Sequence, residues 1–138
     1  CESSLPADIA VCAAAVADYK IANKEITKIK KDGSRQNIIL EENPDILERL
    51  SKRNHLRPKL VVGFAAETSN LERNSDEKLN KKGCDWVLGN NVSENSIFNQ
   101  DTNKIYFTSK LYSENWELMT KKEVAKKLCQ KISLHLNN

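Results

Sequence analysis

Two lysines four residues apart, Lys78 and Lys82, have the spacing best suited to chemistry with phosphate groups. Residues i and i+4 lie on the same face of a helix, so both ammonium groups would point the same way. Such a pair can neutralise the phosphates of a nucleotide, because each ammonium donates charge-assisted hydrogen bonds. The same spacing also fits an ordinary charged helix surface, so a phosphate site and a solvated face remain alternatives.

The elements that would position these lysines are a strand at 60–68 and a helix at 70–82. The strand segment is apolar and β-branched at its start, which is typical of a buried parallel strand that leads into a helix. Phe64 offers a flat face for a base or a ribose, and Gly83 would end the helix. We expect small side chains to let a ligand approach the carboxyl edge of the sheet, at Gly63, Ala65 and Ala66.

The segments before this strand predict a strand, a flap and a helix. The apolar run at 9–17 predicts a central strand covered on both faces. The mixed-charge segment 19–42, with a turn at 32–34, predicts a hairpin-like flap, and its Lys28 could close over an anion or simply be solvated. A helix is predicted from about 43 to 54, with Asn43 as N-cap and Pro44 and Asp45 in its first turn.

The segments after the lysine helix predict further strands and a last helix. A buried strand is predicted at 84–89, an edge strand at 104–109 and a short partner strand within 114–119. A capping-box pattern predicts that the last helix begins at Thr120, with an apolar stripe at Val124, Leu128, Ile132 and Leu136. The alternation predicts an α/β fold, a Rossmann-like three-layer sandwich with a mostly parallel sheet, a flap hairpin and an antiparallel edge.

Composition excludes several classes of function. The chain has 138 residues, a net charge of +3 and 30% charged residues, which indicates one globular domain without a basic nucleic-acid stripe. No apolar run has membrane-spanning length, and the four cysteines form no C-x-x-C pair, so we expect a cytoplasmic protein with reduced thiols. Neither the G-x-G-x-x-G fingerprint nor the G-x-x-x-x-G-K-[ST] phosphate loop is present.

Five short segments, taken in order, resemble the bacterial phosphopantothenate-cysteine ligase family, also called phosphopantothenoylcysteine synthetase. Their order and spacing carry the resemblance, which spans nearly the whole chain. In this family the domain is usually the C-terminal half of a bifunctional coenzyme A biosynthesis flavoprotein. The segments are 13–19 (AAAVADY), 28–31 (KIKK), 43–46 (NPDI), 62–68 (VGFAAET) and 90–92 (NNV).

The resemblance implies a two-step ligation in coenzyme A biosynthesis. CTP, accompanied by Mg²⁺, would activate the carboxylate of 4'-phosphopantothenate as an acyl-cytidylate and release pyrophosphate. The amine of L-cysteine would then displace CMP to form the amide. No flavin is implied for this portion, and no residue stands out as a general base.

The resemblance also implies roles for particular residues. Lys28 would be the catalytic residue, because a cation on the flap could neutralise charge that grows in the transition state. Lys78 and Lys82 would hold the triphosphate, and Phe64 would line the nucleotide pocket. The implied nucleotide-binding set is Cys12, Ala13, Ala14, Asp18, Lys28, Asn43, Pro44, Asp45, Ile46, Leu47, Phe64, Lys78 and Lys82.

The chain also departs from the family pattern. Complete members begin with a glycine-rich strand-turn-helix and a Ser-Asn-x-Ser-Ser-Gly-x-Met-Gly segment, and neither is found in this sequence. We therefore expect 1–138 to be a single, N-terminally truncated ligase domain with 19–42 as its flap. The alternative is a catalytically inactive nucleotide-binding or assembly module. The expected partners are a second copy in the complete enzyme and a flavin-binding decarboxylase domain, with neither nucleic acid nor membrane.

Overall fold

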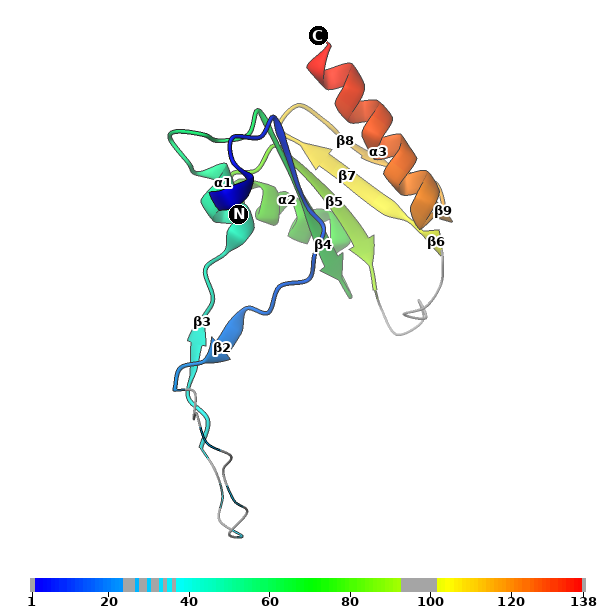
Figure 1. Ribbon diagram of the computed structural model, residues 1–138. Coiled ribbons are helices and arrows are strands. Elements are labelled where there is room, and N and C mark those ends of the chain that lie inside the picture. Colours follow the sequence, from blue (N-terminus) through cyan, green and yellow to red (C-terminus); the bar gives the residue numbers. More distant parts are fainter. Residues whose placement is uncertain are drawn as a thin grey trace.

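The chain alternates strands and helices and places two small ribbons outside its main sheet (Figure 1). The computed structural model describes residues 2–23, 37–92 and 102–137, with the single residues 27, 30, 33 and 35. The elements are a 3-10 helix η1 (Glu2–Ser4), β1 (Ile9–Cys12), β2 (Tyr19–Ile21), β3 (Leu40–Glu42), α1 (Ile46–Ser51), β4 (Leu60–Glu67), α2 (Leu71–Lys82), β5 (Trp86–Asn91), β6 (Thr102–Asn103), β7 (Ile105–Ser109), β8 (Ser113–Asn115), β9 (Met119–Thr120) and α3 (Lys121–Leu136).

The main sheet has five strands in the order β1-β4-β5-β7-β8. The first three are parallel, with Ile9 opposite Leu60 and Val62 opposite Trp86. β7 runs antiparallel to β5, and β8 runs antiparallel to β7. The predicted α/β class, with its mostly parallel sheet and antiparallel edge, is therefore confirmed.

Helices cover both faces of this sheet, so the three-layer sandwich is also confirmed. Successive strand residues point to opposite faces, and β4 follows this rule: Val62 packs on the α3 side and Val61 on the side of α1 and α2. On the first side, α3 contributes Val124, Leu128 and Ile132. On the second side, α1 and α2 contribute Leu47, Leu50 and Leu79.

Two glycines set how closely the helices approach the sheet. A Cβ atom at Gly63 would lie 2.6 Å from Leu47 Cδ2, so α1 occupies the space above this residue. A Cβ atom at Gly89 would overlap Ser75 Oγ and lie 2.9 Å from Leu71 Cδ1, so α2 lies directly on β5 there. The expectation that Gly63 leaves room for a ligand is therefore wrong, because the Leu47 side chain fills that room.

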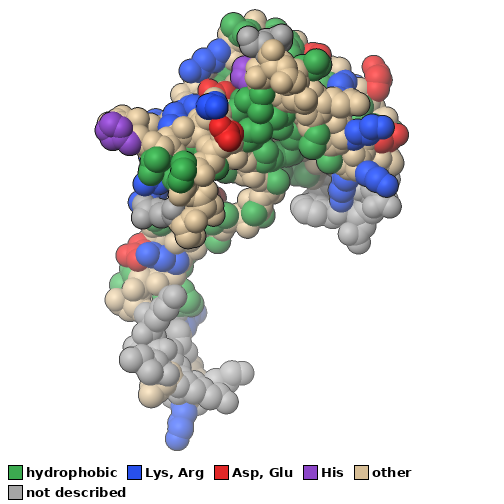
Figure 2. Space-filling view, turned by 45° about the horizontal axis from the view of Figure 1, so that its top comes forward, with side chains coloured by type: hydrophobic (Ala, Val, Ile, Leu, Met, Phe, Trp, Pro, Cys, Tyr) green, Lys and Arg blue, Asp and Glu red, His purple; other side chains and the backbone are tan. Residues whose placement is uncertain are grey.

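Within the flap predicted over 19–42, the described ends β2 and β3 form an antiparallel ribbon, in which Lys20 lies opposite Glu41. It projects away from the sheet as a narrow arm (Figures 1 and 2). Between 46% and 57% of each large apolar side chain is exposed in these strands, at Tyr19, Ile21 and Leu40. The predicted turn at 32–34 falls largely on residues that the structure does not describe.

The strand predicted over 9–17 is shorter than expected and lies at a different place in the sheet. β1 ends at Cys12 and occupies one edge of the described five-stranded sheet, with Val11 45% exposed. The next residues, 13–17, form an exposed connection to the arm. The alanine-rich run is apolar, but alanine is a poor strand former and buries little surface, so its apolar character misled the prediction.

Two C-terminal expectations also need correction. β7 was expected at the edge of the sheet, but β8 covers its outer side, and β8 lies at Ser113–Asn115 rather than within 114–119. The last helix has the predicted capping box between Thr120 and Glu123. Leu136, however, is 43% exposed, because α3 extends beyond the sheet at its C-terminal end (Figure 1).

Candidate functional site

The two lysines predicted from spacing lie together where α1, α2 and β4 meet. Lys78 Nζ donates a hydrogen bond of 2.6 Å to the backbone oxygen of Phe64. Lys82 Nζ lies 2.8 Å from Asp45 Oδ2 and 3.4 Å from Glu48 Oε2. Both ammonium groups are thus held by internal partners, which is a more ordered arrangement than that of lysines on a solvated helix face.

The charges at this junction stabilise one another. Partial burial alone would raise the pKa of Asp45, but the hydrogen bond from the Glu48 N–H and the pairing with Lys82 hold it below its usual value. The hydrogen bond to Asp45 raises the pKa of Lys82, against the opposing effect of burial. Lys52 and then Lys82 lower the pKa of Glu48. The junction therefore keeps Lys82 and the carboxylates of Asp45 and Glu48 ionised near neutral pH.

The start of α1 differs by two residues from the prediction. Asp45, not Asn43, is the N-cap: its Oδ1 accepts a hydrogen bond of 2.8 Å from the Glu48 N–H. Asn43 instead links two connections, because its Nδ2 donates to Ala17 O at 2.8 Å and its N–H donates to Asp18 O at 2.7 Å. The helix also ends at Ser51 rather than near residue 54.

The remaining predicted residues fall around this junction in different ways. Cys12 is half-buried at the end of β1, where burial and then the charge of Asp45 raise the pKa of its thiol. Ala13 and Ala14 are exposed in the connection that follows. The Phe64 ring packs on the α3 side of the sheet, and the backbone oxygen of this residue accepts the hydrogen bond from Lys78. Lys28 lies outside the described residues, and its role stays a prediction.

A cavity of about 410 Å³ lies beside α1. Its lining combines three predicted residues with four that the sequence did not single out: Asn43, Pro44 and Ile46, and Val16, Arg49, Leu50 and Arg53. Arg49 and Arg53 are spaced i, i+4, which is the signal that could have drawn attention to them. A second cavity, of about 530 Å³, is lined by Asn70, Leu71, Glu72, Arg73, Asn91, Lys104 and Asn115 and holds none of the predicted residues.

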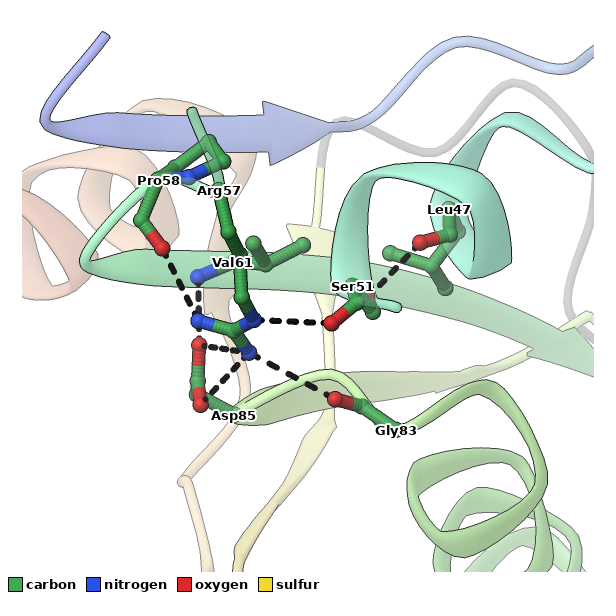
Figure 3. A network of polar contacts seen from close by, with 7 residues as sticks. All are labelled: Leu47, Ser51, Arg57, Pro58, Val61, Gly83 and Asp85. Atoms are coloured by element: carbon green, nitrogen blue, oxygen red, sulfur yellow. Dashed lines mark hydrogen bonds and ion pairs between the residues drawn. The ribbon is translucent and has the colours of Figure 1, made fainter. Parts of the chain in front are cut away.

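Arg57 holds the two helices of the junction at their C-terminal ends (Figure 3). Its guanidinium donates to Ser51 O at the end of α1, to Gly83 O after α2, and to both carboxylate oxygens of Asp85 at 3.0 Å. Asp85 Oδ2 also accepts a hydrogen bond of 2.7 Å from the N–H of Val61, at the start of β4. One side chain thereby ties the C-terminal end of α1 to that of α2 and to the start of β5.

Comparison with known proteins gives a consistent result. Residues 1–135 match the family model described as the DNA/pantothenate metabolism flavoprotein C-terminal domain. The coenzyme A biosynthesis bifunctional protein CoaBC of Haemophilus influenzae is 37% identical over 131 residues, which are 95% of this chain and 32% of that protein. The CoaBC protein of Borreliella burgdorferi is 39% identical over 123 residues, 88% of this chain and 30% of that protein.

Solved structures show the same likeness. The crystal structure of the C-terminal domain of a CoaBC protein has a TM-score of 0.70 and 29% identity to this chain. The alignment covers 94% of this chain and 55% of the crystallised chain. The DNA/pantothenate metabolism flavoprotein of Streptococcus pneumoniae shares the fold with a TM-score of 0.70, over 93% of this chain and 63% of its own, at 19% identity. The chain thus spans about a third of the curated relatives quoted above. Among the described residues, no helix has the length and apolar character needed to cross a membrane.

Proposed function

Because the chain belongs to the family of the DNA/pantothenate metabolism flavoprotein C-terminal domain, we propose that it forms part of a ligase in coenzyme A biosynthesis. The reaction would join 4'-phosphopantothenate to L-cysteine. The names of the relatives support the pathway, and the likeness to the CoaBC C-terminal domain supports the ligase half of such a protein.

The observation that carries the nucleotide part of this proposal is the pair of lysines at the α1–α2 junction. Lys78 and Lys82 hold their ammonium groups on one side of the sheet, near the N-terminus of α1. A triphosphate bound there would meet two fixed cations, which neutralise charge as pyrophosphate departs. We propose CTP as the nucleotide: its α-phosphorus would bond to the substrate carboxylate, and the cysteine amine would later displace CMP.

Mg²⁺ fits this site as an ion that arrives with the triphosphate. Within the described ranges, no three or more His, Cys, Asp or Glu side chains gather as a metal cluster. Mg²⁺ commonly binds through substrate phosphates, and here the phosphates would supply its protein-independent ligands, because Asp45 and Glu48 are already paired with Lys82. In this proposal Mg²⁺ supplies charge neutralisation of the phosphates, while Lys78 and Lys82 orient them.

We also propose partners and a location for the chain. The exposed apolar side chains of the β2–β3 arm suit contact with a second copy, and the bifunctional relatives suggest a flavin-binding decarboxylase domain as a further partner. The described cysteines Cys12, Cys84 and Cys129 are free thiols. Reduced thiols and a reaction that consumes CTP fit the cytoplasm.

Replacing Lys78 with methionine tests the triphosphate assignment. We expect Lys78→Met to weaken the binding of CTP with Mg²⁺ about tenfold, because a charge-assisted hydrogen bond to phosphate is lost. Titration calorimetry would measure the dissociation constant. Lys81→Met is the matched control, because Lys81 is exposed on the same helix and carries the same charge. Equal losses in both variants, or none in Lys78→Met, would remove Lys78 from the site.

A further inference from the structure

The ammonium group of Lys82 is shared between Asp45, the N-cap of α1, and Glu48 within α1, and the two carboxylates bind it unequally. Asp45 is anchored, because Oδ1 caps the helix through the Glu48 N–H while Oδ2 holds Lys82. The Glu48 side chain is 33% exposed and reaches Lys82 at 3.4 Å, a longer contact than the 2.8 Å of Asp45. Glu48 therefore binds the Lys82 ammonium group more weakly than Asp45 does.

Glu48 also has a second partner, Lys52, so its contact with Lys82 can break without leaving the carboxylate unpaired. Its Oε1 accepts a hydrogen bond of 2.6 Å from Lys52 Nζ, one helical turn away. If Glu48 leaves Lys82, its carboxylate keeps Lys52 and solvent, so no unpaired charge is left buried. Asp45 has no such freedom, because its second oxygen is committed to the helix cap. An incoming anion should therefore replace Glu48, rather than Asp45, as a partner of Lys82.

We propose that Glu48 is a positioning residue that competes with bound phosphate for Lys82 and so limits the affinity of the site for a triphosphate. This inference rests on the proposed function for the identity of the ligand. An ammonium group has three N–H donors, and the two carboxylates occupy part of that set. An entering phosphate gains the full charge of Lys82 only when Glu48 turns away to Lys52.

The proposed competition predicts in which direction the affinity for a triphosphate changes when Glu48 loses its charge. Glu48→Gln keeps the shape of the side chain and removes its charge, so Lys82 is held by Asp45 alone. We expect the variant to bind CTP with Mg²⁺, and inorganic tripolyphosphate, about fivefold more tightly, the size of effect measured for exposed ion pairs. Lys82 is itself only 18% exposed at its side chain, so it stays close to α1 after the change.

A double-mutant cycle separates this local competition from a general change in charge. Removing any carboxylate near an anion site raises the affinity for anions, because a long-range repulsion is lost. That gain in affinity would persist in a variant without Lys82. Competition for Lys82 would not persist. The variants are therefore Glu48→Gln, Lys82→Met and both together, each titrated with CTP plus Mg²⁺, with ATP plus Mg²⁺ and with inorganic tripolyphosphate. Glu77→Gln serves as the charge control, because Glu77 pairs with Arg73 on the exposed side of α2.

The outcomes distinguish this inference from the proposed function. Tighter binding by Glu48→Gln that vanishes in the Lys82→Met background supports the inference. The inference is overturned if Glu48→Gln brings no gain in affinity. It is also overturned if the gain persists in the Lys82→Met background or if Glu77→Gln produces the same gain. Coupling seen with tripolyphosphate, but without a preference for CTP over ATP, supports the inference and contradicts the proposed nucleotide. No binding by any variant overturns both.

Discussion

Arg57→Ala is expected to lose about 3 kcal/mol of the free energy of unfolding, since removing one partner of a partly buried ion pair leaves the other charge and several acceptors unsatisfied. The Arg57 and Asp85 side chains are only 26% and 27% exposed, so water replaces the guanidinium poorly. The carbonyls at the ends of α1 and α2 also lose their donor. Urea unfolding followed by circular dichroism would measure the loss.

Arg73→Ala is the matched control for this experiment. Arg73 also forms an ion pair, with Glu77 at 2.8 Å, but its side chain is 78% exposed. We expect this variant to stay within about 0.5 kcal/mol of the parent, as exposed ion pairs usually do. A loss below about 1 kcal/mol in Arg57→Ala, or equal losses in both variants, would contradict the central place given to Arg57.

Gly89→Ala is expected to lose about 2 to 3 kcal/mol, because the added methyl group would overlap Ser75 Oγ and press on Leu71. Both residues belong to α2, so the helix must shift away from β5 to make room. Lys78 and Lys82 lie on the same helix, and we expect CTP binding to weaken together with stability. Chemical unfolding and calorimetry on the same variant would measure the two effects.

A second variant shows whether Ser75 causes this loss. Ser75 is fully buried, and its hydroxyl finds no hydrogen-bond partner in the described structure, so shortening it removes no hydrogen bond seen there. We expect Ser75→Gly combined with Gly89→Ala to be more stable than the sum of the two single changes predicts. Strict additivity would contradict the packing explanation. Ala66→Val, at an exposed position of neighbouring β4, controls for added volume on a strand.

The central part of the fold was predictable because its signals are local. The apolar run of β4, the Gly83 that ends α2 and the capping box of α3 each lie within a few residues, and all three were read correctly. The start of α1 was not fixed locally, because Asn43 and Asp45 are both good N-caps. A contact with Ala17 O, 26 residues away, engages the Asn43 side chain and leaves the cap to Asp45.

The sequence could predict that Lys78 and Lys82 lie together, but not which groups they contact, and their role in a nucleotide site stays a prediction. Spacing singled out Lys78 and Lys82, and the structure places both at one junction. The carboxylate of Glu48 lies 34 residues from Lys82 in the chain, and that of Asp85 lies 28 residues from Arg57. Long-range pairs of this kind depend on how α1 and α2 pack over the sheet, which no local pattern encodes.

Titration calorimetry of the 138-residue chain with CTP and Mg²⁺, with ATP and Mg²⁺ as the comparison, tests the central claim most directly. The claim is that the α1–α2 junction binds the triphosphate group of CTP and that the chain is part of a CTP-dependent ligase. We expect saturable binding of CTP, weaker binding of ATP, and CTP binding that is about tenfold weaker in Lys82→Met. No binding by a chain shown to be folded, or CTP binding that Lys82→Met leaves unchanged, would contradict the claim.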